Sequence, residues 1–263
     1  MPLVTYELNE GVAILSMNRP AALNGLNEEL ITALGEATAR AAADTEARVV
    51  ILRSSSRHFM AGGDLKYLSG EISGRDAAAI EVRVKDQLAR VHAITLNVRN
   101  MEKPVIAAVR GVAAGFGMSL MLACDFALAA DSAYFTLAYC HIALSPDGGA
   151  TWLLPRLVGL RKAAEIALLG DRFDASTAVR LGLVSRTMPV AILDQECLAL
   201  ARRLKDGPAQ ALARTKALLN QSFSTPLERQ LEAEQANFAR CAAEPDFAEG
   251  LKARAEKRKP RFG

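Results

Sequence analysis

Apolar runs of strand length recur along this chain of 263 residues, and loops and helical stretches separate them. Residues 48–53 predict a buried strand, and residues 104–109 predict another. Asn27, which two glutamates follow, is a suitable cap for a helix to about residue 43, and a longer helix is expected over about 76–100. Strands, loops and helices that recur in this order predict an α/β fold.

The two ends of the chain extend this pattern differently. Near the start, residues 3–8 and 12–17 predict two short strands joined by a turn. From about residue 160 the pattern becomes mostly helical, with no low-complexity linker and no repeat of fixed period. Helix starts are indicated at Asp174, at Gly207-Pro208 and, as a capping box with proline in the first turn, at Thr225-Pro226-Leu227-Glu228.

The composition excludes several classes of protein. Hydrophobic residues make up 51% of the chain and charged residues 23%, as in an ordinary globular protein whose core needs neither disulfides nor a structural metal. A net charge of +3 is too small to argue for a polyanionic partner such as nucleic acid. The four cysteines are scattered, the first residues lack the features of a signal peptide, and no apolar run reaches the roughly 18 residues of a membrane span. We therefore expect a cytoplasmic protein with reduced cysteines, no metal and no membrane association.

Two glycine-containing turns are places where backbone amides could meet an anion. In the first, within residues 58–66, two adjacent glycines precede Asp64 and a helix start. The second is Gly115-Phe116-Gly117, at the amino end of an apolar helix over about 118–124, where unpaired donors and the helix dipole favour negative charge. Two donors from two segments would make an oxyanion hole, whereas either turn alone is as readily a tight turn with no further role.

Together with other segments, these turns resemble the enoyl-CoA hydratase/isomerase (crotonase) superfamily, in order and in spacing. The resemblance covers nearly the whole chain and rests on Asn18-Arg19-Pro20, Met60–Leu65, Pro104–Gly115, Cys124-Asp125 and the basic ending Glu256–Phe262. It implies a crotonase (ClpP-like) spiral of β-β-α units over residues 1–200. It also implies a helical segment over residues 201–263 that serves trimerisation and completes the CoA site, with a homotrimer or a dimer of trimers as the expected assembly.

The chemistry that this superfamily shares is stabilisation of an enolate formed from an acyl-CoA thioester. On the family pattern, the backbone N–H groups of Gly63 and Phe116 would hold the thioester oxygen. Phe116 stands at a position where glycine is common in the family. The donor is a main-chain N–H, so it is present with phenylalanine as well, but the side chain would reshape the pocket. Coenzyme A is part of the substrate, so the resemblance implies no separate cofactor.

The acid and base groups depart from the hydratase pattern. Hydratases of the family orient a water with two glutamates, which align here with Ser119 and Tyr139. A hydroxyl and a phenol with a pKa of about 10 cannot supply the carboxylate base that water activation at neutral pH requires.

The segment Leu144–Arg156 instead resembles the aspartate-bearing isomerases, including enoyl-CoA double-bond isomerases and ring-opening isomerases of aromatic-CoA degradation. In those enzymes one carboxylate, here Asp147, moves a proton between carbons, and an apolar pocket would raise its pKa.

Asp147 also has a plainer interpretation. On local sequence alone, Pro146-Asp147-Gly148-Gly149 before an apolar helical run favours a turn and helix cap over a catalytic segment. The family alignment favours catalysis, and one residue can do both. Ser119 lacks a G-x-S-x-G setting, so a small helix residue is expected there rather than a nucleophile.

His92 offers a different chemistry. Its position matches the histidine base of aryl-CoA dehalogenases, in which Asp147 would attack an aromatic ring and the histidine would activate water. Tyr139 stands where those enzymes have tryptophan, and a lone helix histidine is more often packed or solvated. The other histidines, His58 and His141, carry no motif and are expected to be structural.

Binding of CoA would need cations for its phosphates and an apolar cleft for the acyl group. Lys66 and Lys257 match family positions near the nucleotide, although a solvated basic tail would look the same, and Ala21 stands where the family often has a further lysine. The other expected substrate contacts, some of which would serve equally as core residues, are Ala61, Asp64, Leu65, Tyr67, Gly115, Met118, Ser119 and Trp152.

The sequence therefore predicts an acyl-CoA-processing enzyme, with double-bond or ring isomerisation by Asp147 as the preferred reaction. Three alternatives stay open: an enoyl-CoA hydratase with other groups in place of the glutamates, an aryl-CoA dehalogenase using Asp147 and His92, and a non-catalytic RNA- or acyl-CoA-binding protein. No interleaved aromatic and basic pattern supports RNA binding.

Overall fold

The computed structural model describes residues 1–263 and contains two β-sheets with helices on both sides. The strands are β1 (Val4–Asn9), β2 (Val12–Met17), β3 (Val49–Ser54), β4 (Val105–Val109), β5 (Val112–Ala114), β6 (Phe126–Ala130), β7 (Tyr134–Thr136), β8 (Phe173–Asp174) and β9 (Arg186–Met188). The helices are α1 (Glu28–Ala43), α2 (Leu65–Ile72), α3 (Ala77–Asn100), α4 (Phe116–Ala123), α5 (Ala150–Val158), α6 (Leu160–Leu169), α7 (Ala175–Arg180), α8 (Leu193–Lys205), α9 (Ala209–Gln221), α10 (Leu227–Ala242) and α11 (Pro245–Ala255). Short 3-10 turns are η1 (Pro20–Ala22), η2 (Tyr139–Ile142), η3 (Val190–Ile192) and η4 (Ser222–Ser224).

The main sheet has six strands in the order β1-β2-β3-β4-β6-β9. The first two strands form an antiparallel hairpin, and all later neighbours in this sheet are parallel, with Ile51 opposite Ile106 and Ile106 opposite Phe126. Strands β3 and β4 are buried almost throughout, which explains why both read as continuous apolar runs. The predicted α/β fold is confirmed, and the strand and helix ranges agree with the sequence to within two residues at the ends named above.

The smaller sheet runs alongside in the order β5-β7-β8. Strand β4 leads into β5 and then α4, and β6 leads into β7 and then α5, so that a main-sheet strand, a small-sheet strand and a helix repeat. After β3, a single bridge between Met60 and Ala113 continues the small sheet. These repeats are the β-β-α spiral that the resemblance implied.

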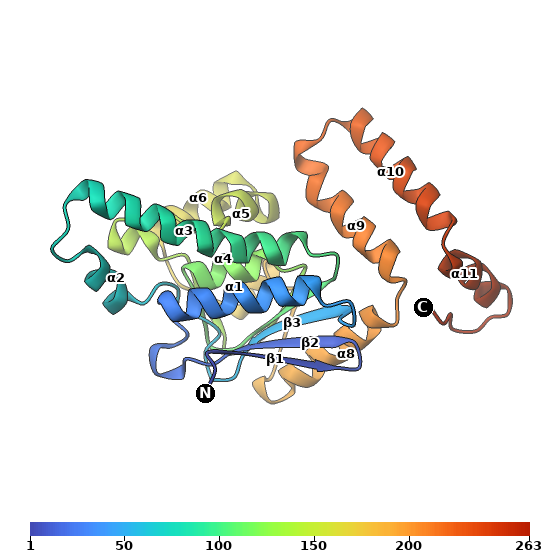
Figure 1. The fold of residues 1–263 in the computed structure, drawn as a ribbon, viewed down its shortest axis with the longest axis horizontal. Helices are drawn as coiled ribbons and strands as arrows, with labels where there is room; N and C mark the ends of the chain where they lie inside the picture. Colours follow the sequence, from blue (N-terminus) through green and yellow to red (C-terminus); the bar gives the residue numbers. More distant parts are fainter.

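Helices cover both faces of the main sheet (Figure 1). Helices α1, α3 and α4 lie on one face over the larger core, a cluster of 43 buried residues, whereas α8 lies on the other face over a cluster of 12. By the usual value of about 25 cal/mol per Å² of buried apolar surface, the larger cluster is the main source of stability. The two glycine-containing turns adjoin this larger cluster, which includes Met60 and Phe116.

Most helix starts follow the predicted capping chemistry. The carboxamide of Asn27 accepts a hydrogen bond from Leu30 N at 3.0 Å, and Asp174 accepts from Thr177 N at 2.8 Å. The capping box at Thr225 is wrong: its hydroxyl donates to Gln221 O in the preceding turn at 2.9 Å, and α10 begins after Pro226 without a side-chain cap. The threonine thus satisfies a carbonyl of the preceding turn instead of an amide at the start of α10.

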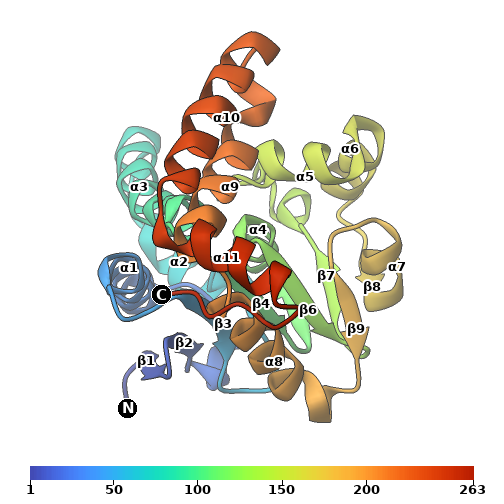
Figure 2. The same ribbon diagram turned by 90° about the vertical axis from the view of Figure 1, so that its right-hand side faces the viewer.

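Helices α9 to α11 extend away from the sheets as an arm that carries the carboxy terminus (Figures 1 and 2). Residue 200 lies inside α8, which packs on the main sheet, so the change of architecture falls later, near Gly207-Pro208. Helix α10 buries no residue, and the arm exposes several large apolar side chains: Leu219, Phe223, Leu227, Leu231 and Phe238. No helix of the structure has the length and apolar character needed to cross a bilayer.

A buried ion pair ties the arm to the spiral. Lys216 on α9 lies 2.7 Å from the carboxylate of Asp125, and the two side chains are only 9% and 17% exposed. The same ammonium donates to the carbonyls of Lys103 at 2.9 Å and Val98 at 3.2 Å. Burial lowers the pKa of Lys216, and the Asp125 charge opposes that effect.

We predict that Lys216→Met lowers the free energy of unfolding by about 3 kcal/mol, because removing one partner of a buried pair leaves the other charge uncompensated. The double variant Lys216→Met/Asp125→Asn should lose less than the two single variants summed, as measured by urea unfolding. Glu165→Gln, which removes the exposed pair with Lys162, is the control and should cost less than about 0.5 kcal/mol. A Lys216→Met variant no less stable than this control would show that the Lys216–Asp125 pair does not stabilise the fold.

Candidate functional site

The two glycine-containing turns lie in direct contact. Main-chain hydrogen bonds join Met60 to the small sheet, from Met60 N to Val112 O at 3.0 Å and from Ala114 N to Met60 O at 2.9 Å. A Cβ atom on Gly62 would lie 3.0 Å from Ala114 O and 3.4 Å from Phe116 N, and Gly62 has φ +95°. Only glycine permits both the conformation and the close approach, so the first turn lies directly against the start of α4.

Two amides at this contact have no hydrogen-bond acceptor within the chain. Phe116 is the first residue of α4, where helical geometry leaves the N–H without a partner, and Gly63 N also donates to nothing. The residues on either side of Gly63 are fixed, because Leu26 N donates to Gly62 O at 2.7 Å and Asp64 N donates to Leu26 O at 2.9 Å. The site thus holds two unpaired donors from different segments on a rigid frame.

The loop that carries Asp147 rests on the second of these turns. Ser119 Oγ donates to Asp147 O at 2.9 Å, and Thr95 Oγ1 donates to Gly148 O at 3.3 Å. Gly148 has φ +61°, and a Cβ atom there would lie 2.6 Å from Cδ2 of the Phe116 ring. The phenylalanine therefore occupies the space that a side chain at Gly148 would need, and it packs the acidic loop against the residue that bears the free amide.

The carboxylate of Asp147 accepts a hydrogen bond from the Tyr139 hydroxyl. The helix-cap interpretation of this aspartate is wrong, because Gly149 occupies the cap position of α5 and no side chain caps that helix. Tyr139 also approaches the amide turns, since a Cβ atom on Gly115 would lie 3.9 Å from the Cζ atom of the tyrosine. Asp147, Tyr139 and the two turns therefore form one constellation.

Burial shapes the acid–base properties of this pair. It raises the pKa of Asp147 above the usual aspartate value, while the Tyr139 hydrogen bond and the charge of His92 act in the opposite direction. Burial, and then the Asp147 charge, also raise the pKa of the Tyr139 phenol, so the tyrosine stays protonated and donates. His92 is exposed on α3 and hydrogen-bonds to neither residue.

Several other expected site residues surround the amide turns. Ala61 and Gly115 belong to the turns themselves, and Ser119 is fully buried, with its hydroxyl used to hold the Asp147 loop. Met118 is also fully buried and belongs to the large core. The carboxylate of Asp64 is occupied, since it accepts from Lys66 N at 3.0 Å and binds Arg19 at 2.7 Å.

The remaining expected residues lie in different surroundings. Leu65 and Lys66 are exposed at the start of α2, and Tyr67 donates to Glu28 at 3.1 Å. Trp152 lines a separate cavity of about 460 Å³ between the spiral and α9. Lys257 follows α11 in the arm, and Lys66 lies at the start of α2. Figure 1 shows these two helices at opposite ends of the molecule, so one chain does not bring the two lysines together.

The other two histidines make structural contacts. His58 Nδ1 accepts a hydrogen bond from Val112 N at 3.3 Å, and His141 Nε2 lies 3.1 Å from Gly170 O. The role of Thr95 in supporting the loop that carries Asp147 could not be predicted, because a threonine within a long helix carries no signal of a distant partner. No three His, Cys, Asp or Glu side chains are grouped so that they could hold a metal ion.

Comparison with known proteins identifies the family to which the chain belongs. The family model described as enoyl-CoA hydratase/isomerase matches residues 7–263. The chain is 33% identical to the 1,2-epoxyphenylacetyl-CoA isomerase of Escherichia coli, over 100% of this chain and 98% of that protein. It is 36% identical to the 2,3-dehydroadipyl-CoA hydratase of the same organism, over 95% and 94%.

A crystal structure of an enoyl-CoA hydratase from Polaromonas superposes with a TM-score of 0.92 at 34% identity, and the match covers 99% of each chain. Names of hydratases and isomerases thus occur together among the similar proteins. This chain belongs to the enoyl-CoA hydratase/isomerase family, the crotonase superfamily.

Proposed function

We propose that this protein is an isomerase of acyl-CoA thioesters, in which Asp147 moves a proton between two carbons of the acyl group. The N–H groups of Gly63 and Phe116 hold the thioester oxygen in this proposal. The observation that carries it is the partly buried Asp147 carboxylate, which receives a hydrogen bond from a protonated Tyr139 and lies on the loop packed against Phe116.

The proposed reaction balances with a single carboxylate. Asp147 takes a proton from the carbon next to the carbonyl or from the carbon beyond the double bond, and the electron pair moves through the π system onto the thioester oxygen. The resulting enolate returns to the thioester as the carboxylic acid gives the same proton to the other carbon. Each amide aimed at the oxygen would supply about 3–4 kcal/mol, since the charge on it develops only in the transition state.

Hydration is less well supported by the groups around Asp147. Ser119, at one hydratase-type glutamate position, is buried and donates to Asp147 O. Tyr139, at the other, has its pKa raised further from neutrality. Addition of water requires a base that activates it, and a second carboxylate does not stand at either position.

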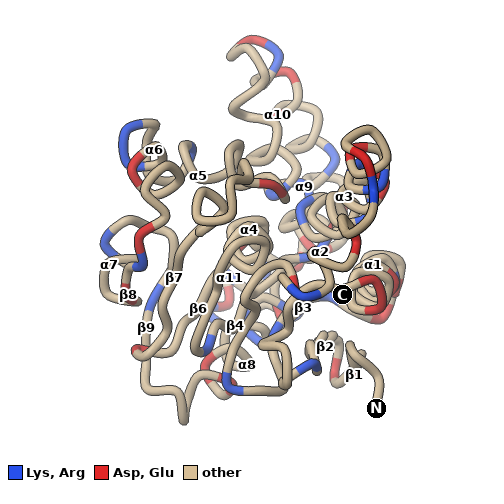
Figure 3. Tube along the Cα trace, turned by 90° about the vertical axis from the view of Figure 1, so that its left-hand side faces the viewer, with Lys and Arg blue, Asp and Glu red and all other residues tan.

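The other two functions also find less support. The dehalogenase reaction would use His92 to activate water, but its side chain is exposed and no hydrogen bond joins it to Asp147. RNA binding would favour a surface of concentrated positive charge, whereas Lys and Arg are interspersed with Asp and Glu in the view of Figure 3. The cytoplasmic location and the absence of a separate cofactor stay predictions.

Assembly into a homotrimer or hexamer is part of the proposal. The arm exposes apolar side chains on α9 and α10, and Lys257 in that arm is far from Lys66 of the same chain. Both lysines can face one CoA only if a second copy supplies the arm. We predict that Leu231→Glu/Phe238→Glu lowers the mass measured by light scattering to that of the single chain; an unchanged oligomer would contradict the arrangement.

Asp147→Asn is predicted to lower the rate of 3-enoyl-CoA to 2-enoyl-CoA isomerisation by about 10²- to 10⁴-fold, the usual contribution of a general base.

The same variant tests the effect of Asp147 on stability. The pKa of Asp147 is higher in the folded than in the unfolded chain, so its contribution to stability is fully present below the unfolded pKa and is lost as pH rises through the folded pKa. The asparagine variant should therefore be at least as stable as the wild type at pH 7, as measured by thermal unfolding.

The matched control for this variant is Asp131→Asn, an exposed aspartate in the turn between β6 and β7, which should keep full activity. Two results would count against the isomerase: an Asp147→Asn variant that isomerises at the wild-type rate, or wild-type enzyme that hydrates a trans-2-enoyl-CoA as fast as it moves the double bond.

Tyr139→Phe is predicted to shift the acid limb of the pH–rate profile to higher pH. The tyrosine hydrogen bond opposes the effect of burial on the pKa of Asp147, so its removal raises that pKa further. The fraction of carboxylate, and with it kcat, should fall at mildly acidic pH and recover at alkaline pH. A profile unchanged from the wild type would show that the phenol does not act through Asp147.

A further inference from the structure

Helix α2 begins two residues after Gly63, yet little apolar surface holds it in place. None of its residues is buried, and its cap, Asp64, is the residue next to Gly63. Leu68 packs back over the turn, because a Cβ atom on Gly63 would lie 2.9 Å from Leu68 Cδ1. Any change in the tilt of α2 therefore reaches the residue that bears the first amide.

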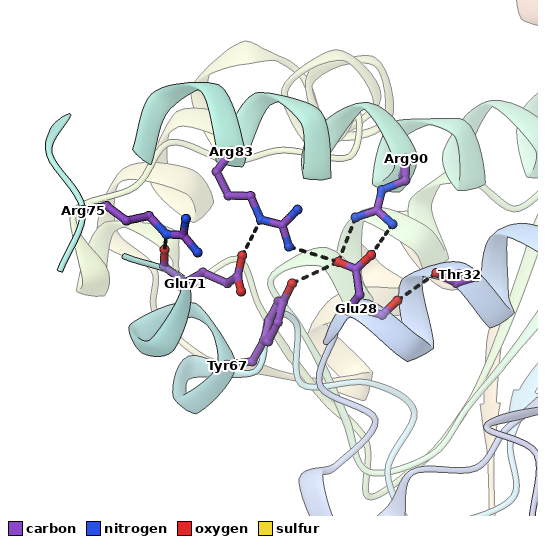
Figure 4. A network of polar contacts seen from close by, with 7 residues as sticks. All are labelled: Glu28, Thr32, Tyr67, Glu71, Arg75, Arg83 and Arg90. Carbon is purple, nitrogen blue, oxygen red and sulfur yellow. Dashed lines mark hydrogen bonds and ion pairs between the residues drawn. The ribbon is translucent and has the colours of Figure 1, made fainter. Parts of the chain in front are cut away.

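Polar contacts anchor α2 instead, and they converge on Glu28, the first residue of α1 (Figure 4). Its carboxylate accepts from both terminal nitrogens of Arg90 on α3, one of them at 2.8 Å. Tyr67 on α2 donates to the same carboxylate at 3.1 Å, and Arg83 on α3 lies 3.6 Å from it. One carboxylate thus joins three successive helices, α1, α2 and α3.

A second acid completes the network on α2. Arg83 lies between the two acids and donates through Nε to Glu71 at 2.5 Å. Arg83 and Arg90 are seven residues apart and so share one face of α3. Loss of the Glu28 charge would leave these two cations with Glu71 alone, and Tyr67 would lose its charged acceptor.

We propose that Glu28 is a positioning residue for the Gly63 amide: by tying α2 to α1 and α3, its carboxylate holds the turn that presents this amide to the thioester oxygen. The inference rests on the proposed role of Gly63 in the isomerase. Glu28 lies on a different element from the amide and reaches it only through Tyr67, α2 and Leu68.

The charge state of Glu28 makes this anchor insensitive to pH near neutrality. The hydrogen bond from Arg90 outweighs burial and lowers the pKa of Glu28 to about 2. The side chain is 40% exposed, so salt should weaken the network, since the screening length falls from about 10 Å at 0.1 M to about 3 Å at 1 M.

The test compares Glu28→Gln, which keeps the shape and removes the charge, with Glu81→Gln, which breaks the exposed pair with Lys85 on α3. Amide hydrogen exchange over residues 65–72 is expected to rise at least tenfold in Glu28→Gln and to stay at the wild-type rate in the control. The midpoint of thermal unfolding should move by less than about 3 °C, because the network is partly exposed.

The effect on the amide is measured with acetoacetyl-CoA, a thioester that forms a stable enolate. Its affinity and the absorbance of its bound enolate should fall about tenfold in Glu28→Gln and in wild type at 1 M NaCl, but not in Glu81→Gln. Unchanged exchange over residues 65–72 would overturn the proposal, and so would faster exchange with unchanged enolate binding. Wild-type protein that binds the probe but does not isomerise would refute the proposed reaction and leave this inference intact.

Discussion

The site depends on the approach of one backbone segment to another, where Gly62 lies against Phe116 N at the start of α4. A side chain at Gly62 would meet Ala114 O at 3.0 Å, so any larger residue would separate the two turns. The main-chain hydrogen bonds between Met60 and the small sheet fix this approach from one side, and the Leu26 bonds fix it from the other. In the proposed reaction, the helix-start donor of Phe116 and the turn donor of Gly63 share one acceptor, the thioester oxygen, without movement of the backbone.

Asp147, the proposed base, illustrates the cost of placing a carboxylate in such a site. Burial raises its pKa, which opposes ionisation, and the Tyr139 hydrogen bond and the charge of His92 offset part of this effect. The Ser119 and Thr95 hydroxyls hold the neighbouring carbonyls and so fix the loop in place. The Phe116 ring lies so close to Gly148 that no side chain fits at Gly148 in this arrangement. A carboxylate held in this way has a higher proton affinity than an exposed one, which suits transfer of a proton from carbon and back.

Local signals predicted the fold well and the site only in part. Asn27 and Asp174 cap their helices as their sequence contexts suggest, because capping depends on residues three or four apart. Local sequence misled at Asp147, where two left-handed glycines move the cap to Gly149. The Glu28 network could not be predicted from the sequence, because it joins residues from three helices. The position of Trp152 could not be predicted either, because the direction in which it points depends on how α5 packs.

The most direct test follows the proton itself. A 3-enoyl-CoA labelled with deuterium on the carbon next to the carbonyl is converted by wild-type enzyme in ordinary water, and the product is analysed by mass spectrometry and NMR. A single, partly buried carboxylate that carries the proton predicts deuterium on the γ carbon in a measurable share of the 2-enoyl product. Absence of deuterium from the γ carbon, together with a hydroxyacyl product that contains solvent oxygen, would contradict the account.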